Sequence, residues 1–156
     1  MSGRTIRQPQ NTTVRAQQAE LKLVWSQTFS RDASKQFNTA QKFVDSEVLR
    51  RMVKYTPSRN NILSKNAVLG TKIGSGHIYY TSPYARYQYY GVLMVSSLTG
   101  SPWARHGEKK VLTSRMLTYS EARHPEAQRL WFETMKTNHL QAIMRGAQRI
   151  AGGGKR

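Results

Sequence analysis

The chain has 156 residues, 38% of them hydrophobic and none of them cysteine, which fits one folded domain without disulfides or thiolate metal sites. No apolar run approaches the roughly 20 residues that a membrane span needs. The 25 Lys and Arg residues against 8 Asp and Glu give a net charge of +17, which attracts polyanions such as DNA. Because the excess is spread along the whole chain, it favours a basic surface beside a nucleic acid over a module that reads sequence with one helix or arm.

The N-terminal part of the chain has a polar composition followed by a short alternating stretch. Residues 1–19 are rich in Gln, Asn, Thr and Arg and have no apolar period, which predicts a flexible, basic N-terminal arm. Leu21, Leu23 and Trp25 then alternate with their neighbours, which predicts a short half-buried strand. We expect a single domain over residues 20–150.

A long helix is predicted next. One apolar stripe of helical spacing is formed by Phe37, Val44, Val48, Met52 and Tyr55. The stripe predicts a helix over residues 35–55, and Pro57 is placed to end it.

The middle of the chain predicts a turn, two strands and a helical turn. Asn60-Asn61 favours a sharp turn with left-handed backbone angles. The patterns of residues 68–73 and 77–81 predict two strands joined by a tight connection at Gly74-Ser75-Gly76. Residues 84–90 predict a helical turn, and Gly91 stands where a helix often ends with a glycine.

A long connection and a second long helix complete the chain. Residues 92–124 predict a long inserted loop, and loops of this length are usually functional or ordered by a partner. Apolar spacing after Pro125 predicts a helix over residues 126–149, and residues 151–156 predict a flexible tip. The fold class that follows is α+β, with a small antiparallel sheet of about four strands packed against the two main helices.

The titratable residues do not indicate catalysis. The four histidines are far apart in sequence and lack metal-ligand spacing. Asp32, Asp45 and Glu47 read as surface charges around the first long helix rather than as magnesium ligands of a nuclease. We therefore expect no enzyme activity, no cofactor and no metal site.

The candidates for contacts with partners are the tyrosine-rich segment, the long loop and the N-terminal arm, and we expect the loop and the arm to carry most contacts between subunits. Tyrosine and arginine are enriched in protein interfaces, although tyrosines beside cations could also stack on bases. The candidate interface residues are Tyr84, Arg86, Tyr87, Tyr89, Tyr90, Trp103, Lys109, Lys110 and Tyr119. Candidates for facing DNA are Arg4, Arg7, Arg15, Arg105, Lys109 and Lys110.

Four groups of residues stand in an order that points to a family. They are Tyr55-Thr56-Pro57 with Leu63, Ile78-Tyr79-Tyr80, Pro83-Tyr84-Ala85-Arg86-Tyr87-Gln88-Tyr89-Tyr90-Gly91, and Pro125-Glu126-Ala127 with Trp131-Phe132-Glu133 and Lys136. From about Leu21 to Lys136 the chain resembles the minor capsid or tail-completion family of long-tailed bacteriophages. It departs at Asn60-Asn61, where the family has Thr-Gly, but asparagine tolerates the same left-handed angle.

The resemblance implies a structural virion protein without catalytic residues. Such a protein is made in the cytoplasm of the bacterial host and forms a homo-oligomeric ring in the neck of the particle. Its implied partners are the head connector and the tail-tube or tail-terminator proteins, with non-specific contact to genomic DNA in the channel and none to a membrane. A hexamer is the preferred expectation, with a dodecamer as the alternative.

A second function remains open on the sequence alone. The same charge and tyrosines would suit a basic DNA-binding module that acts outside the particle. Tight DNA binding by the isolated chain with a steep salt dependence would favour that module, whereas weak and unspecific binding would favour the neck protein.

Overall fold

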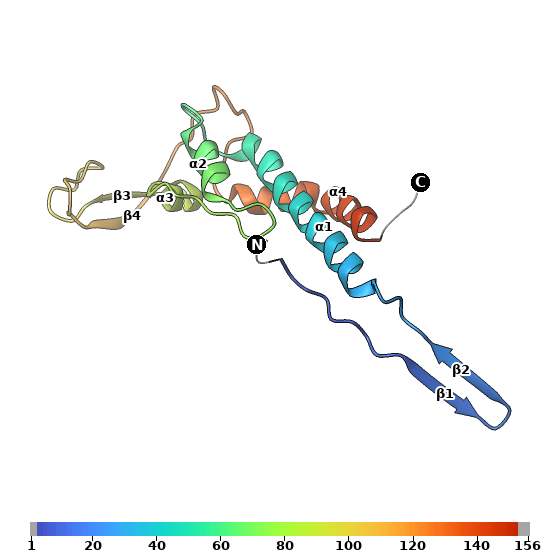
Figure 1. Cartoon of the computed structure of the whole chain (residues 1–156). Coiled ribbons are helices and arrows are strands. Elements are labelled where there is room, and N and C mark those ends of the chain that lie inside the picture. Colours follow the sequence, from blue (N-terminus) through green and yellow to red (C-terminus); the bar gives the residue numbers. More distant parts are fainter. Residues whose placement is uncertain (1–2, 153–156) are drawn as a thin grey trace.

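The computed structural model describes residues 3–152 and shows two long helices with a β-hairpin at either end of the molecule (Figure 1). The elements in chain order are β1 (Thr12–Ala16), β2 (Ala19–Leu23), α1 (Phe29–Met52), the 3-10 turn η1 (Val53–Tyr55), α2 (Ile62–Gly70), α3 (Ala85–Tyr90), β3 (Val92–Ser96), β4 (Lys110–Met116) and α4 (Trp131–Ala151). The α+β class is confirmed, as is the presence of two main helices.

The core lies where α1 and η1 pack against α4. Met52 and Tyr55 end the apolar stripe of the first helix and meet Trp131, Met135 and Ile143 of α4. All five are almost completely buried, and burying a side chain of this size contributes roughly 1.5–3 kcal/mol. The helix expected over residues 35–55 is thus confirmed, although α1 begins earlier, at Phe29.

The prediction of one sheet with about four strands is wrong. The four strands form two separate antiparallel pairs, β1–β2 and β3–β4. Thr12 to Ala16 form a strand within the segment expected to be a flexible arm, and every residue of β1 and β2 is exposed, so the half-buried strand expected from Leu21 and Leu23 is not half-buried. The segment expected to be a long loop contains β3 and β4, and only residues 97–109 connect them.

The strands expected over residues 68–73 and 77–81 are also wrong. Asn61 adopts the left-handed φ of 59°, as expected for the turn, and the chain then enters α2. Leu63 and Ala67 lie one helical turn apart and are both turned inward, and this packing overrides the β propensity of Val68. Residues 77–81 contain no regular secondary structure.

The glycine turn between those two segments is attached to α1. Asp45 is buried, and its Oδ2 accepts the backbone N–H groups of Gly74 at 2.7 Å and Gly76 at 3.2 Å. Gln41 Nε2 donates to the other carboxylate oxygen at 2.8 Å. A side chain read as a surface charge therefore fixes the position of this turn.

The last helix starts five residues later than expected, at Trp131. The N–H groups of Gln128 and Leu130 donate to the carbonyls of Tyr55 and Tyr89, which holds the preceding segment out of a helix. Ala151, expected in the tip, is the last residue of α4, and residues 153–156 of the tip lie outside the described residues.

Candidate assembly interface

Three aromatic rings form the centre of the tyrosine-rich region. Trp131 Nε1 donates to the hydroxyl of Tyr80 at 3.0 Å, and the ring of Tyr89 meets Trp131 edge to face with centroids 4.9 Å apart. Burial raises the pKa of both Tyr80 and Tyr89 above the ordinary value. The two tyrosines therefore pack the core and remain neutral hydroxyls at physiological pH.

An open pocket of about 540 Å³ lies beside this aromatic group. Its apolar lining includes Ile78, Tyr80, Tyr89, Trp131 and Phe132, and its polar lining includes His77, Ser82 and Arg86. The pocket thus has an aromatic wall and a basic residue, Arg86, which is exposed.

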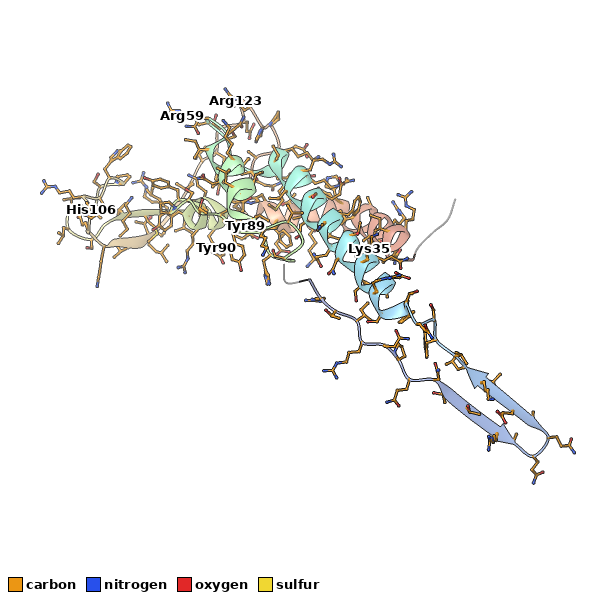
Figure 2. All side chains as sticks on the ribbon, in the orientation of Figure 1. Lys35, Arg59, Tyr89, Tyr90, His106 and Arg123 are labelled. Carbon is orange, nitrogen blue, oxygen red and sulfur yellow. The ribbon has the colours of Figure 1, made fainter. Side chains whose placement is uncertain are left out.

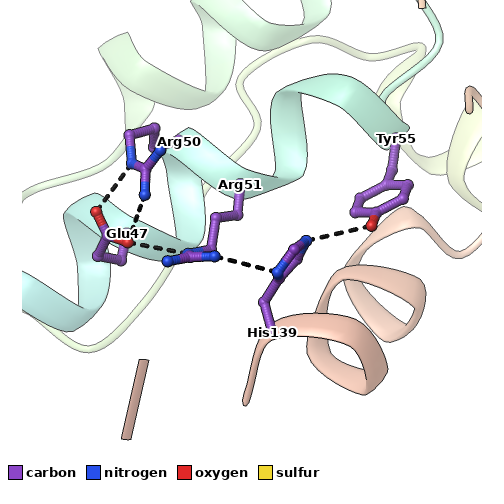
Figure 3. Close-up of polar contacts among 5 residues, drawn as sticks. All are labelled: Glu47, Arg50, Arg51, Tyr55 and His139. Carbon is purple, nitrogen blue, oxygen red and sulfur yellow. Dashed lines mark hydrogen bonds and ion pairs between the residues drawn. The ribbon is translucent and has the colours of Figure 1, made fainter. Parts of the chain in front are cut away.

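A chain of polar contacts connects α1 and η1 to α4 (Figure 3). Arg50 and Arg51 both donate to the carboxylate of Glu47, at 2.7 to 2.9 Å. Hydrogen bonding to Arg50 is the main reason why the pKa of Glu47 falls to about 2. The acid is therefore ionised at every pH at which proteins normally fold.

The same chain of contacts fixes the tautomer of His139. Arg51 Nη1 lies 3.1 Å from His139 Nδ1 and can only donate, so Nδ1 accepts and Nε2 carries the hydrogen. Nε2 lies 3.2 Å from the hydroxyl oxygen of Tyr55, which Asn138 Nδ2 also approaches at 3.0 Å. In its neutral form, His139 of α4 thus hydrogen-bonds to Arg51 of α1 and to Tyr55 of η1.

The structure does not bring the candidate interface residues together. Tyr84, Arg86, Tyr87, Tyr89 and Tyr90 lie on or next to α3, where Tyr84, Arg86 and Tyr90 are exposed and Tyr87 and Tyr89 are half-buried. Tyr119 is half-buried, and its hydroxyl donates to the carbonyl of Gln88. Trp103, Lys109 and Lys110 lie on the β3–β4 hairpin, whose tip, marked by His106, is distant from Tyr89 and Tyr90 (Figure 2).

The candidate DNA-facing residues lie in two separate places. Arg4, Arg7 and Arg15 belong to the arm and β1, whereas Arg105, Lys109 and Lys110 belong to the opposite hairpin (Figure 1). Arg15 Nε is 3.2 Å from Glu20 Oε2, so its charge is partly compensated within the hairpin. The two groups cannot form one continuous basic patch.

Sequence reasoning missed the most exposed apolar surface of the N-terminal hairpin. Val14 pairs with Leu21, and Leu23 pairs with Thr12, so these residues share one face of β1–β2. Val14, Leu21 and Leu23 are 59%, 72% and 53% exposed, while Arg15, Glu20 and Lys22 form ion pairs on the other face. The signal that could have found this face is the alternation on either side of Gln17-Gln18.

No family model, curated protein or solved structure matches this chain. Within residues 3–152 no helix is both long and apolar enough to cross a bilayer. The same residues contain no group of three or more His, Asp or Glu side chains that could share a metal ion.

Proposed function

We propose that the chain is a structural subunit of the neck of a long-tailed phage particle, a tail-completion or head–tail joining protein that links the head connector to the tail tube. The observation that carries the proposal is the β1–β2 hairpin. It projects from the helical body with an apolar face that nothing in the described chain covers. A projecting hairpin with an exposed apolar face is typical of a contact between subunits.

The energetics of the hairpin support a partner. A two-stranded hairpin is marginally stable by itself in water, and every residue of both strands of this one is exposed. Covering Val14, Leu21 and Leu23 with a neighbouring subunit would remove apolar surface from water on each of them. The hairpin therefore gains stability from assembly more than from the fold of its own chain.

The location of the hairpin supports a ring. It lies at one end of the molecule, so a neighbour that receives it on another surface makes a head-to-tail contact, and head-to-tail contacts form a ring when the rotation per subunit closes. A hexamer is our preferred closed ring, with a dodecamer as the alternative. The residues behind the resemblance to the neck family, such as Tyr55, Tyr80 and Trp131, are core residues in this fold.

The experiment compares the wild-type chain with a Val14→Glu/Leu21→Glu variant. We expect sedimentation velocity and negative-stain images to show rings for the wild type and monomers for the variant, with the same circular dichroism. Thr13→Glu is the matched control, because it adds a carboxylate to the polar face of the same strand. Rings in the double variant, or a wild type that stays monomeric at high concentration, would refute the proposal.

Location is tested in particles from cells that express the phage genes. We expect the chain in purified virions, and we expect its deletion to leave filled heads and tails unjoined. A chain that stays entirely in the cell fraction, with normal particles formed without it, would support the DNA-binding module that acts outside the particle.

A further inference from the structure

The β3–β4 hairpin and its loop, residues 92–116, form a basic finger at the end of the molecule opposite β1–β2 (Figure 1). The loop of residues 97–109 forms its tip, and His106 is at the extremity (Figure 2). The basic finger contains two features that neither the core nor the proposed ring contact uses: uncompensated positive charge and an exposed tryptophan.

The positive charge of the basic finger is uncompensated. Its cations are Arg105, Lys109, Lys110 and Arg115, and none of them forms an ion pair within the part of the chain that the structure describes. Its one carboxylate, Glu108, is turned inward and accepts from the Ser96 hydroxyl and, at 2.8 Å, from the backbone N–H of Arg105. Glu108 thus organises the loop.

Trp103 is the most exposed aromatic side chain that the structure describes, at 87%. The loop that carries it is ordered from within, because Ser96 Oγ accepts the N–H groups of Leu98 and Thr99 at 3.1 and 3.0 Å. Lys110 Nζ also donates to the carbonyl of Pro102 at 2.7 Å. The preformed loop therefore holds the large amphipathic ring of Trp103 in water, beside the cations of the basic finger.

We infer that the basic finger binds the sugar–phosphate backbone of double-stranded DNA, with Arg105 and Lys109 on phosphates and Trp103 against the backbone. The inference rests on the proposed function for its setting, a ring around a DNA channel, but the contact itself does not require the ring. Uncompensated cations favour a polyanion over the same finger of a neighbouring copy, which carries the same charges. The β1–β2 hairpin is less suited, because Glu20 forms ion pairs with both Arg15 and Lys22.

The first experiment measures the salt dependence of DNA binding by the full chain. A fluorescently labelled short duplex is titrated over a range of NaCl concentrations with the wild type and with Arg105→Gln/Lys109→Gln. Each phosphate contact contributes about 0.9 to the slope of log affinity against log salt, so we expect the slope to fall by about 1.8. Arg145→Gln/Arg149→Gln is the matched control, because it removes two exposed arginines from α4.

The inference is wrong if the finger variant keeps the wild-type slope or if the α4 control lowers the slope as much. We also expect duplex binding to quench the fluorescence of the wild type more than that of Trp103→Phe, since Trp131 is buried and Trp25 is half-buried between β2 and α1, away from the finger. A single strand that binds more than tenfold tighter than the duplex would overturn the assignment to duplex DNA.

A separate readout distinguishes DNA from a protein partner. If Trp103→Ala abolishes self-association and leaves the DNA affinity unchanged, the finger is a subunit contact and the inference fails. Failure of the proposed function is a different result, namely rings that persist in Val14→Glu/Leu21→Glu while the duplex titrations behave as expected.

Discussion

His139 is held between Arg51 and Tyr55 in a position that suits only its neutral ring. Burial lowers its pKa below the ordinary 6.5, and the nearby charges of Arg51 and Lys54 lower it further. Protonation would place a hydrogen on Nδ1 facing the guanidinium. Protonation of His139 in acid therefore weakens the contact between α1 and α4.

We predict that the stability of the fold decreases as the pH falls below about 6.5. The unfolded chain protonates His139 near its ordinary pKa while the folded chain does not, so its contribution is fully present above 6.5 and is lost toward the lower folded pKa. Glu47 acts in the same direction at lower pH, because its pKa of about 2 makes its contribution disappear as the pH falls from 4.5 to about 2. Urea unfolding at a series of pH values measures both effects.

The variant His139→Gln should remove the loss of stability that begins as the pH falls below about 6.5, but leave the loss below pH 4.5 that comes from Glu47. His106→Gln is the control, because His106 is exposed at the finger tip. An unchanged pH profile in His139→Gln would contradict this assignment.

At the scale of elements, α1 and α4 approach each other closely at Gly146. A Cβ added there would lie 2.4 Å from Cζ of Phe43, a ring on α1. Replacing glycine with alanine inside a helix normally stabilises it by about 1 kcal/mol, but here the close approach reverses the sign. We predict that Gly146→Ala destabilises the fold by about 1–3 kcal/mol, as overpacking does.

The measurement is urea unfolding of Gly146→Ala in two backgrounds. In Phe43→Leu, where the ring is gone, we expect the added methyl group to be neutral or stabilising. Equal destabilisation in both backgrounds would show that the ring is not the cause.

The elements also show which parts of the fold could be predicted from the sequence. α1 was predictable because Val44, Val48 and Met52 of its expected stripe pack inward, although Phe37 is 54% exposed. α3 was predictable because Gly91 takes the left-handed φ of 71° that ends it. α2 was not, because Val68 and Leu69 resemble a strand and only the inward position of Ala67 favours a helix. The start of α4 depends on Leu130 bonding to the carbonyl of Tyr89, a contact between distant residues that no local pattern contains.

The sequence also predicted only part of the candidate assembly interface. The length of the segment 92–124 indicated Trp103 and the cations near it, because a loop this long is usually functional or ordered by a partner. Tyr89 was listed for an interface although it packs on Trp131, since consecutive tyrosines do not reveal which ring faces inward. The apolar face of β1–β2 was missed because each strand has only five residues.

At the scale of the whole molecule, the net charge of +17 works against the compact state. The 8 Asp and Glu residues are already counted in this charge, so the 25 Lys and Arg residues exceed the carboxylates by 17. We predict that raising the salt from low to high concentration stabilises the chain by about 1–2 kcal/mol, roughly 3–6 °C in melting temperature.

Differential scanning calorimetry in NaCl checks this prediction. Arg145→Gln/Arg149→Gln lowers the net charge and should therefore reduce the increase in melting temperature that salt produces. A melting temperature independent of salt would mean that the cations are too far apart to repel.

The shared core of Met52 and Tyr55 with α4 also has a consequence for biosynthesis. The two halves of the core are separated by α2, α3 and the finger, so ribosomes must complete all of these before α4 can meet α1. During that interval Met52 and Tyr55 face solvent on a nascent helix and are available to chaperones. The hairpins, whose contacts are local, are able to form while the centre of the molecule is still open.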